Sequence, residues 1–247
     1  NLSEKIQNFR KVRFEKPPLY LNEVLKDFDP HFETPFFKNL FSEIINSVGG
    51  FSKTVIVNEK NTSIKLTYGS GGLHSVNENE IYVSTERKIV KTSDFQSLYP
   101  NLIINYLCIR FPEVLQRYAE IKAERVLAKK NKNKIEDLFL KLILNSTSGL
   151  LDNEHSWLYF PEGALKLRLI GQLVLTKIIE ACIQNNWRVV SANTDGIETI
   201  IPIEEETLYE ETLNKISLDC FNLILEHEQY KSIYYKNVNS YIAINAI

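Results

Sequence analysis

The sequence predicts an α+β fold, because strand-like and helix-like stretches occupy separate blocks of the chain. β-branched runs bounded by turn residues fill much of 54–94 and recur near 188–201 and 233–243. Stretches of helical composition at 113–147 and 163–186 lie between these blocks. This arrangement is typical of α+β proteins. With 247 residues, 44% of them hydrophobic, the chain is long enough for a substantial core.

The first 53 residues contain scattered prolines and phenylalanines, which predict short irregular elements. One helix is expected from Phe36 to Ser47, ended by Gly49 and Gly50. No reactive pattern is visible in this region. We expect it to serve as a connector and a packing surface.

Four strands are expected next, at 54–57, 64–68, 81–84 and 88–94. The segment Tyr68-Gly69-Ser70-Gly71-Gly72-Leu73-His74 separates the second strand from the third. Its three glycines allow positive φ angles and close approach of a partner to the backbone. It is either a flexible hairpin loop or a contact surface. His74 has no nucleophile or metal-spaced ligand beside it and is expected to make local hydrogen bonds.

A helical hairpin is predicted from 113–130 and 135–147, joined by a short polar turn. Residues 110–141 contain nine Lys or Arg against five Asp or Glu, so positive charge is concentrated here. The simplest interpretation is a solvated helix face. Lys141 and Asn145 are four residues apart and therefore share one face. Gly149 is expected to end the second helix.

The remaining elements include a long apolar helix at 163–186, expected to pack under the sheet. The turn sequence Asn193-Thr194-Asp195-Gly196 lies between two β-rich runs and predicts a hairpin. A helix with an acidic start is expected at 204–226, followed by a terminal hairpin of 233–236 with 239–243.

The most specific pattern is Asp94-Phe95-Gln96-Ser97-Leu98-Tyr99-Pro100. A strand ends at Asp94, and Pro100 opens an apolar run with helical spacing. Alone, this is a strand-to-helix turn with an acidic residue facing a cleft. The form D-x-x-S-L-Y-P fixes five residue types, which makes coincidence improbable in a chain of this length.

Three motifs, in this order, resemble those of family B DNA polymerases. The Asp94 motif resembles the first palm motif, Lys141-x-x-x-Asn145-Ser146 the fingers motif, and the Asp195 turn the second catalytic motif. The glycine segment resembles the Tyr-x-Gly-Gly segment that faces template DNA, with one extra residue. The terminal hairpin is similar to a loose K-x-x-Y segment that contacts primer DNA. The resemblance covers 66–245.

The resemblance implies an antiparallel palm sheet packed on helices, with a two-helix fingers insertion. The implied domains are a connector and palm-packing region at 1–64, palm at 65–112 and 150–247, and fingers at 113–149. The chain starts with Asn1 and contains no methionine. We therefore expect a piece of a longer, phage-like DNA replication enzyme, with exonuclease and thumb domains in the full-length chain.

The resemblance also implies residue roles in adding deoxynucleoside triphosphates to a primer 3′-hydroxyl on primer-template DNA. The implied catalytic residues are Asp94 and Asp195, which with the Phe95 carbonyl would hold two Mg²⁺ ions. The implied nucleotide-binding residues are Tyr99, Leu98, Arg125, Lys129, Lys141 and Asn145. Tyr99 would exclude a ribose 2′-hydroxyl. The implied DNA-binding residues are Tyr68, Gly71, Gly72, Lys236 and Tyr241.

Three positions depart from the family pattern. Asn193 replaces the usual first aspartate of the second motif, Ser148 replaces a tyrosine, and Gly196 replaces a serine. These departures leave open an inactive DNA-binding module derived from a polymerase. A helical scaffold with coincidental motifs is a third, remote alternative, because three motifs occur in order.

Composition and sequence pattern exclude several other classes of protein. No apolar run approaches the roughly 20 residues that span a bilayer, and no secretory signal is visible. The three cysteines are far apart and are expected to be buried, reduced thiols. These features predict a cytoplasmic protein, and the family resemblance implies a bacterial or phage-infected cell. The net charge of −2 argues weakly against a nucleic-acid binder, although local charge decides this question.

Overall fold

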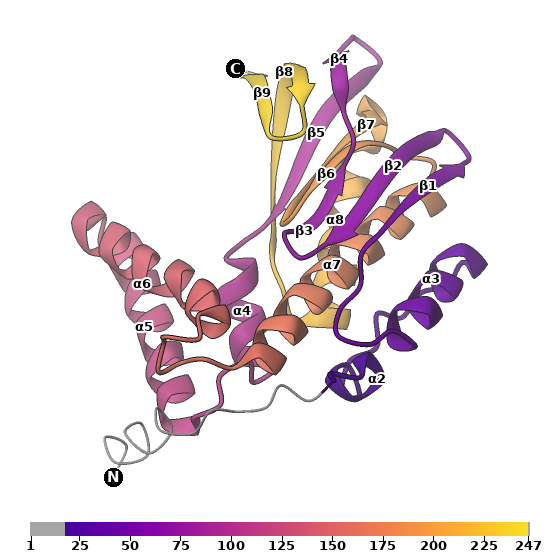
Figure 1. The fold of residues 1–247 in the computed structure, drawn as a ribbon. Helices are drawn as coiled ribbons and strands as arrows, with labels where there is room; N and C mark the ends of the chain where they lie inside the picture. Colours follow the sequence, from indigo (N-terminus) through magenta and orange to yellow (C-terminus); the bar gives the residue numbers. More distant parts are fainter. Residues whose placement is uncertain (1–17, 247) are drawn as a thin grey trace.

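The computed structural model describes residues 18–246 and contains a nine-stranded sheet with helices against it (Figure 1). Every strand pairing in these residues is antiparallel. The strand order is β1-β2-β3-β6-β7-β5-β8-β4, with β9 paired to β8. The strands are β1 (Lys53–Glu59), β2 (Thr62–Gly69), β3 (Gly72–Ser75), β4 (Glu78–Val83), β5 (Lys88–Phe95), β6 (Arg188–Asn193), β7 (Gly196–Pro202), β8 (Leu225–Asn237) and β9 (Ser240–Asn245). The predicted α+β class with an antiparallel sheet on helices is confirmed.

The helices divide into a group under the sheet and a hairpin beside it (Figure 1). They are α2 (Leu21–Val24), α3 (Pro35–Ile45), α4 (Leu98–Asn105), α5 (Pro112–Lys130), α6 (Lys134–Asp152), α7 (Pro161–Gln184) and α8 (Glu206–Phe221), with a 3₁₀ turn at Ile203–Glu205. Helices α7 and α8 pack beneath the strands, whereas α5 and α6 form the predicted antiparallel hairpin. Helices α3, α5 and α7 each begin with a proline, which suits a first turn.

Helix α7 is the centre of the core. Nearly all of its side chains from Gly163 to Ile183 are buried, as the apolar sequence of this helix predicts. Trp187 follows it and is also fully buried, with its ring 4.9 Å from the ring of Tyr209 on α8. The sheet above α7 therefore rests on a rigid support.

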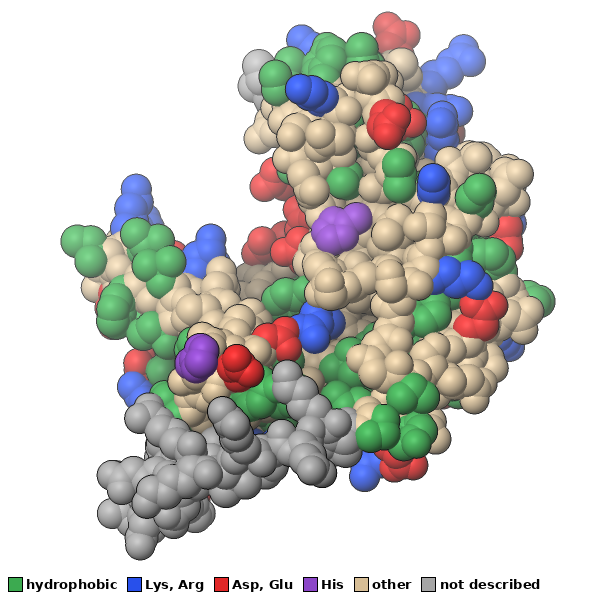
Figure 2. Space-filling view, viewed as in Figure 1, with side chains coloured by type: hydrophobic (Ala, Val, Ile, Leu, Met, Phe, Trp, Pro, Cys, Tyr) green, Lys and Arg blue, Asp and Glu red, His purple; other side chains and the backbone are tan. Residues whose placement is uncertain are grey.

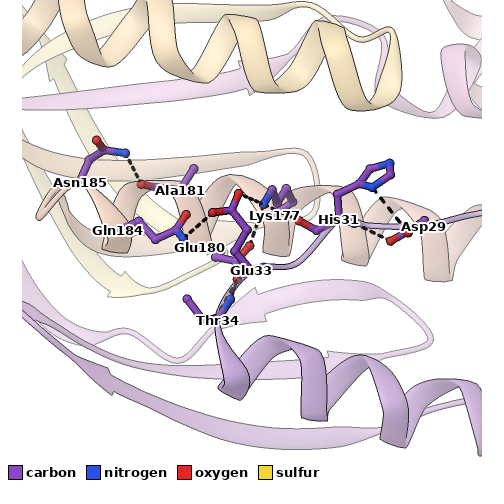
Figure 3. Close-up of polar contacts among 9 residues, drawn as sticks. All are labelled: Asp29, His31, Glu33, Thr34, Lys177, Glu180, Ala181, Gln184 and Asn185. Carbon is purple, nitrogen blue, oxygen red and sulfur yellow. Dashed lines mark hydrogen bonds and ion pairs between the residues drawn. The ribbon is translucent and has the colours of Figure 1, made fainter.

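The segment before α3 is tied to α7 by a buried charged network (Figure 3). The fully buried Glu180 carboxylate accepts hydrogen bonds from the backbone N–H groups of Glu33 and Thr34, at 2.9 and 2.7 Å. Lys177 donates to Glu180 at 2.9 Å and to the carbonyl of His31 at 2.6 Å. A buried carboxylate is tolerable when paired and hydrogen-bonded in this way. From residue 18 onward, this region packs against α7 through these contacts, and its role as a connector stays a prediction.

Two predicted helix ends are wrong. Helix α6 continues through Gly149 to Asp152, because Leu151 is fully buried and keeps the last turn against the core. Helix α8 ends at Phe221 instead of 226, where Asn222 adopts a left-handed conformation with φ of 54°. The chain then enters β8 at Leu225, since those residues complete the sheet beside β5.

The glycine segment contains a strand that the sequence did not predict. Residues Gly72–Ser75 form β3, which pairs with β2 and with β6. The hairpin interpretation of this segment is confirmed. The short strand was missed because two glycines precede it and its apolar alternation is brief.

The three cysteines are free thiols. Cys108 and Cys182 are buried and Cys220 is half-buried, and burial raises the pKa of the Cys108 thiol to about 12. Across residues 18–246, no helix has the length and apolar character needed to cross a membrane.

Candidate active site

The sheet brings together two aspartates that are about a hundred positions apart in the sequence. Asp94 lies near the end of β5, directly opposite Gly196 on β7. Asp195 occupies the turn between β6 and β7, next to Gly196. The backbone N–H of Phe95 donates a 2.8 Å hydrogen bond to the carbonyl of Asp195, which fixes the turn to β5. Asp94 and Asp195 therefore lie at one patch of the sheet, as predicted.

The Asp195 turn is also held from the β3 side. The N–H of Thr194 donates to the carbonyl of Leu73 at 2.8 Å, and the Thr194 hydroxyl lies 3.1 Å from Nε2 of His74. Thr194 has a φ of 53°, which is uncommon for a β-branched residue. Gly72 has a φ of 120°, and a Cβ there would lie 3.2 Å from the Thr194 hydroxyl. The glycine segment thus supports the turn that carries Asp195.

Carboxylates other than the predicted pair face the same side of the sheet. Glu198 on β7 and Glu228 on β8 lie opposite Thr92, two residues before Asp94, and Glu226 lies opposite Asp94 itself. Residues opposite one another in an antiparallel pair share a face, as do residues two apart on one strand. Figure 2 shows acidic side chains gathered in the hollow between the helical hairpin and the sheet. Glu198 was not predicted from the sequence, because its place in the cluster depends on the pairing of β7 with β5.

Negative charge in this cluster is poorly solvated. Asp94 is exposed to the cleft, yet the surrounding protein partly desolvates its carboxylate; this effect and the charges of Glu198 and Asp195 raise its pKa to about 7. Desolvation also raises the pKa of Asp195, and burial raises that of Glu198. Such shifted carboxyl groups in a cleft are typical of functional sites.

On the opposite face of β5, the charge of Lys91 is neutralised by ion pairs within the protein. The buried ammonium of Lys91 contacts Glu206 at 2.7 Å and Glu210 at 2.5 Å, both from the α8 region. Ser93 contacts the hydroxyl of Tyr209 at 2.7 Å. Because strand residues alternate between faces, the Lys91 charge lies behind the sheet while the Asp94 charge lies in front.

A cavity of about 500 Å³ opens between Asp195, the start of α4 and the helical hairpin. Eight of the predicted site residues line it: Phe95, Leu98, Tyr99, Arg125, Lys129, Lys141, Asn145 and Asp195. Lys141 and Asn145 lie on successive turns of α6, as predicted. Arg125 is held by an ion pair with Asp137 at 2.9 Å and a 3.3 Å contact with the Ser97 hydroxyl. The cavity therefore has cations on one wall and carboxylate on the other.

Tyr99 and Leu98 occupy the floor of this cavity in different ways. The Tyr99 ring lies against α7 at Gly171, where an added Cβ would be 3.3 Å from the ring. Desolvation and the Asp195 charge raise the pKa of Tyr99, so its hydroxyl remains protonated at neutral pH. Leu98 as a whole is only 4% exposed, so it offers little surface to a ligand.

The predicted magnesium ligands are two carboxylates and a carbonyl. In residues 18–246, no group of three or more His, Cys, Asp or Glu side chains has an arrangement that could hold a metal ion. The predicted set has two carboxylates, Asp94 and Asp195, with the Phe95 carbonyl, and Mg²⁺ binds such oxygens while keeping several waters. The pKa values of both carboxyl groups are raised because their ionised forms are destabilised, and a bound divalent cation would stabilise these ionised forms. These oxygens fit the ion chemically.

The predicted DNA-binding residues do not line this cavity. Tyr68 was wrongly assigned, because its side chain is fully buried and its hydroxyl contacts Thr176 at 2.9 Å, out of reach of DNA. Gly71 and Gly72 lie at the hairpin tip between β2 and β3. Lys236 and the half-exposed Tyr241 lie on the β8–β9 hairpin and line a separate hollow. Their contact with DNA stays a prediction.

The fold places this chain among α+β proteins with an antiparallel sheet packed on helices. No protein-family model and no curated protein matches the sequence. Among solved structures, the chain is similar to the family B DNA polymerase from the hyperthermophilic archaeon Pyrobaculum calidifontis, with a TM-score of 0.52 and 14% sequence identity. The match covers 83% of this chain and 30% of that polymerase. At this identity the likeness is one of fold, and this chain spans less than a third of the polymerase length.

Proposed function

We propose that this chain carries the palm and fingers of a phage-like family B DNA polymerase that performs template-directed DNA synthesis. The observation that supports this most directly is the pairing of Asp94 and Asp195 beside a cavity lined by Arg125, Lys129 and Lys141. Carboxylates for a cation and cations for a triphosphate, on opposite walls, are what nucleotidyl transfer requires. The fold likeness to a family B DNA polymerase adds to this support.

In the proposed reaction, the primer 3′-oxygen attacks the α-phosphorus of a deoxynucleoside triphosphate. The new O–P bond forms as the bond from the α-phosphorus to the bridging oxygen breaks, which releases pyrophosphate and the hydroxyl proton. Asp94, Asp195 and the Phe95 carbonyl would hold two Mg²⁺ ions, whose chemistry is to favour the ionised 3′-hydroxyl and to stabilise phosphate charge. Arg125, Lys129 and Lys141 would orient the triphosphate by charge-assisted hydrogen bonds, with Asn145 beside them.

Tyr99 would select the sugar. Its ring is held between the cavity and α7 at Gly171, so it can yield little to a bulky ligand. A 2′-hydroxyl above this ring would be excluded by its volume. Ser148 also lines the cavity but is too small to present a flat surface to the new base pair.

A second candidate is an inactive module that binds DNA without synthesis. The amide of Asn193 in place of a carboxylate favours it, because one potential cation ligand is lost. Against it stand Asp94 and Asp195, which retain both bridging carboxylates. The polymerase proposal includes three further features. These are exonuclease and thumb domains in the full-length chain, a DNA partner, and a bacterial or phage-infected cell as the location.

Primer extension on a labelled primer-template with Mg²⁺ tests the proposal. Asp195→Asn should reduce extension by roughly a thousandfold or more, because an amide cannot balance the charge of two cations. The matched control is Asp219→Asn on α8, an exposed carboxylate paired with Lys215. Equal extension by Asp195→Asn and the wild type would refute the ligand assignment. DNA binding without extension by the wild type would favour the second candidate.

A further inference from the structure

A second cavity lies on the other side of Arg125 from the first. It has a volume of about 440 Å³ and shares four lining residues with the first cavity: Gln96, Ser97, Arg125 and Lys129. Its other lining residues are Asn101, Lys122, Val126, Leu218, Asn222 and Ile224. The two cavities are therefore neighbours that share a wall, which includes the Arg125 and Ser97 side chains, 3.3 Å apart.

The charged side chains that line this second cavity are all cationic, although one of them, Arg125, is already paired with Asp137. Three cationic side chains line it, Lys122, Arg125 and Lys129, and no carboxylate is among the lining residues in the described chain. The three cations are spaced at i, i+3 and i+7 on α5, so they form one stripe along the helix. Because no aromatic side chain lines the cavity, it offers no surface on which a nucleobase would stack. Its chemistry suits a small anion.

The Lys122 ammonium has donors available for a ligand. Its half-buried ammonium donates to the amide oxygen of Asn101 at 2.5 Å. The Asn101 side-chain nitrogen donates to the carbonyls of Gln96 and Ser97, at 2.8 and 3.0 Å, which orients the oxygen toward Lys122. An ammonium has three donors, so a single amide oxygen leaves two of them for a ligand. Burial without a carboxylate lowers the pKa of Lys122, and a bound anion would relieve this cost.

We propose that this second cavity binds inorganic pyrophosphate, and that Lys122 is the residue specific to it. The inference rests on the proposed function, in which pyrophosphate is the leaving group formed in the first cavity. Arg125 and Lys129 line both cavities, so the anion passes from one to the other while remaining in contact with cations. The second cavity would therefore receive the product on the side away from Asp195 and clear the first cavity for the next triphosphate.

Calorimetric binding of inorganic pyrophosphate to the chain, without DNA or turnover, tests this inference. Lys122→Gln keeps a polar side chain that reaches Asn101 but removes the charge. It should weaken pyrophosphate binding about tenfold or more, the usual range for loss of a hydrogen bond to a charged group. Lys130→Gln is the matched control, because Lys130 is on the same helix, exposed, and lines neither cavity. Thermal melts of both variants identify any loss of folding.

A non-hydrolysable deoxynucleoside triphosphate analogue separates the two cavities. Lys141 lines only the first of these two cavities, and Lys122 lines only the second. Lys141→Gln should therefore weaken binding of the analogue more than binding of pyrophosphate. Lys122→Gln should weaken binding of pyrophosphate more than binding of the analogue. Wild-type pyrophosphate affinity in a folded Lys122→Gln variant would overturn the inference, as would equal losses for both ligands. If the chain binds pyrophosphate in a Lys122-dependent way but does not extend a primer, the result would count against the polymerase proposal and not against this cavity.

Discussion

Gly196 leaves the space in which the Asp94 carboxylate lies, and adding one methyl group there is the sharpest test of the site. A Cβ on Gly196 would lie 1.6 Å from Oδ1 of Asp94 and 2.8 Å from its Cγ. Since ordinary contact begins at 3.4 Å, the carboxylate of a Gly196→Ala variant must move by roughly 2 Å. Misplacing a catalytic group by about 1 Å can cost on the order of 100-fold in rate, so extension should fall at least that far.

The fold should survive this change. The severe clashes are with the Asp94 side chain, and the nearest backbone atom, the Ser93 carbonyl oxygen at 3.3 Å, needs to shift by only a few tenths of an ångström. Rotating the Asp94 side chain costs about 0.5–1.5 kcal/mol, while Gly→Ala stabilises by about 0.4–1 kcal/mol through the unfolded chain. The melting temperature of Gly196→Ala should therefore stay within a few degrees of the wild type. Gly149→Ala is the control, because nothing lies within 4 Å of a Cβ there. Full activity of Gly196→Ala would show that the Asp94 position does not matter and would refute the reasoning.

Three further predictions concern the same face of the sheet. Tyr99→Ala should raise ribonucleotide incorporation about tenfold or more relative to deoxynucleotides; an unchanged sugar preference in extension assays would remove the Tyr99 assignment. The raised pKa of Asp94 means that the folded state binds this proton more tightly than the unfolded state, so stability falls as pH rises from about 4 to about 7. Asp94→Asn should accordingly raise the melting temperature by roughly 2–4 °C at pH 8, after allowance for solvent screening, and by less at pH 5; equal shifts would contradict this. His74→Ala should lower extension about tenfold and raise the Mg²⁺ concentration needed for half-maximal rate, because the Asp195 turn loses a support. The effect of His74→Gln should be milder, because glutamine can still form a hydrogen bond with Thr194. Identical behaviour of the two variants would contradict a positioning role for His74.

The sequence was sufficient for features that depend on local pattern. The Asn193–Gly196 turn and the spacing of Lys141 and Asn145 each follow from short-range rules, and the structure has them where expected. The pairing of Asp94 with the Asp195 turn was reached through the family resemblance, and the strand register bears it out.

Features that depend on register between distant strands were not predictable. Glu198 joins the acidic cluster because β7 pairs with β5, which no local pattern reports. The burial of Tyr68 depends on Thr176 of α7, more than a hundred positions away. Helix α6 passes Gly149 because Leu151 packs in the core, and this tertiary contact outweighs the glycine's preference for a helix end.

The Glu180 network has a consequence for how the chain can be shortened. A truncation that starts at residue 35 would remove Glu33, Thr34 and the His31 carbonyl, and would leave the buried Glu180 carboxylate with Lys177 as its remaining partner. Loss of hydrogen bonds to a buried charged group costs about 1–3 kcal/mol, a large share of the stability of a domain. The smallest autonomous folding unit must therefore begin upstream of the first strand, within the stretch that precedes α3.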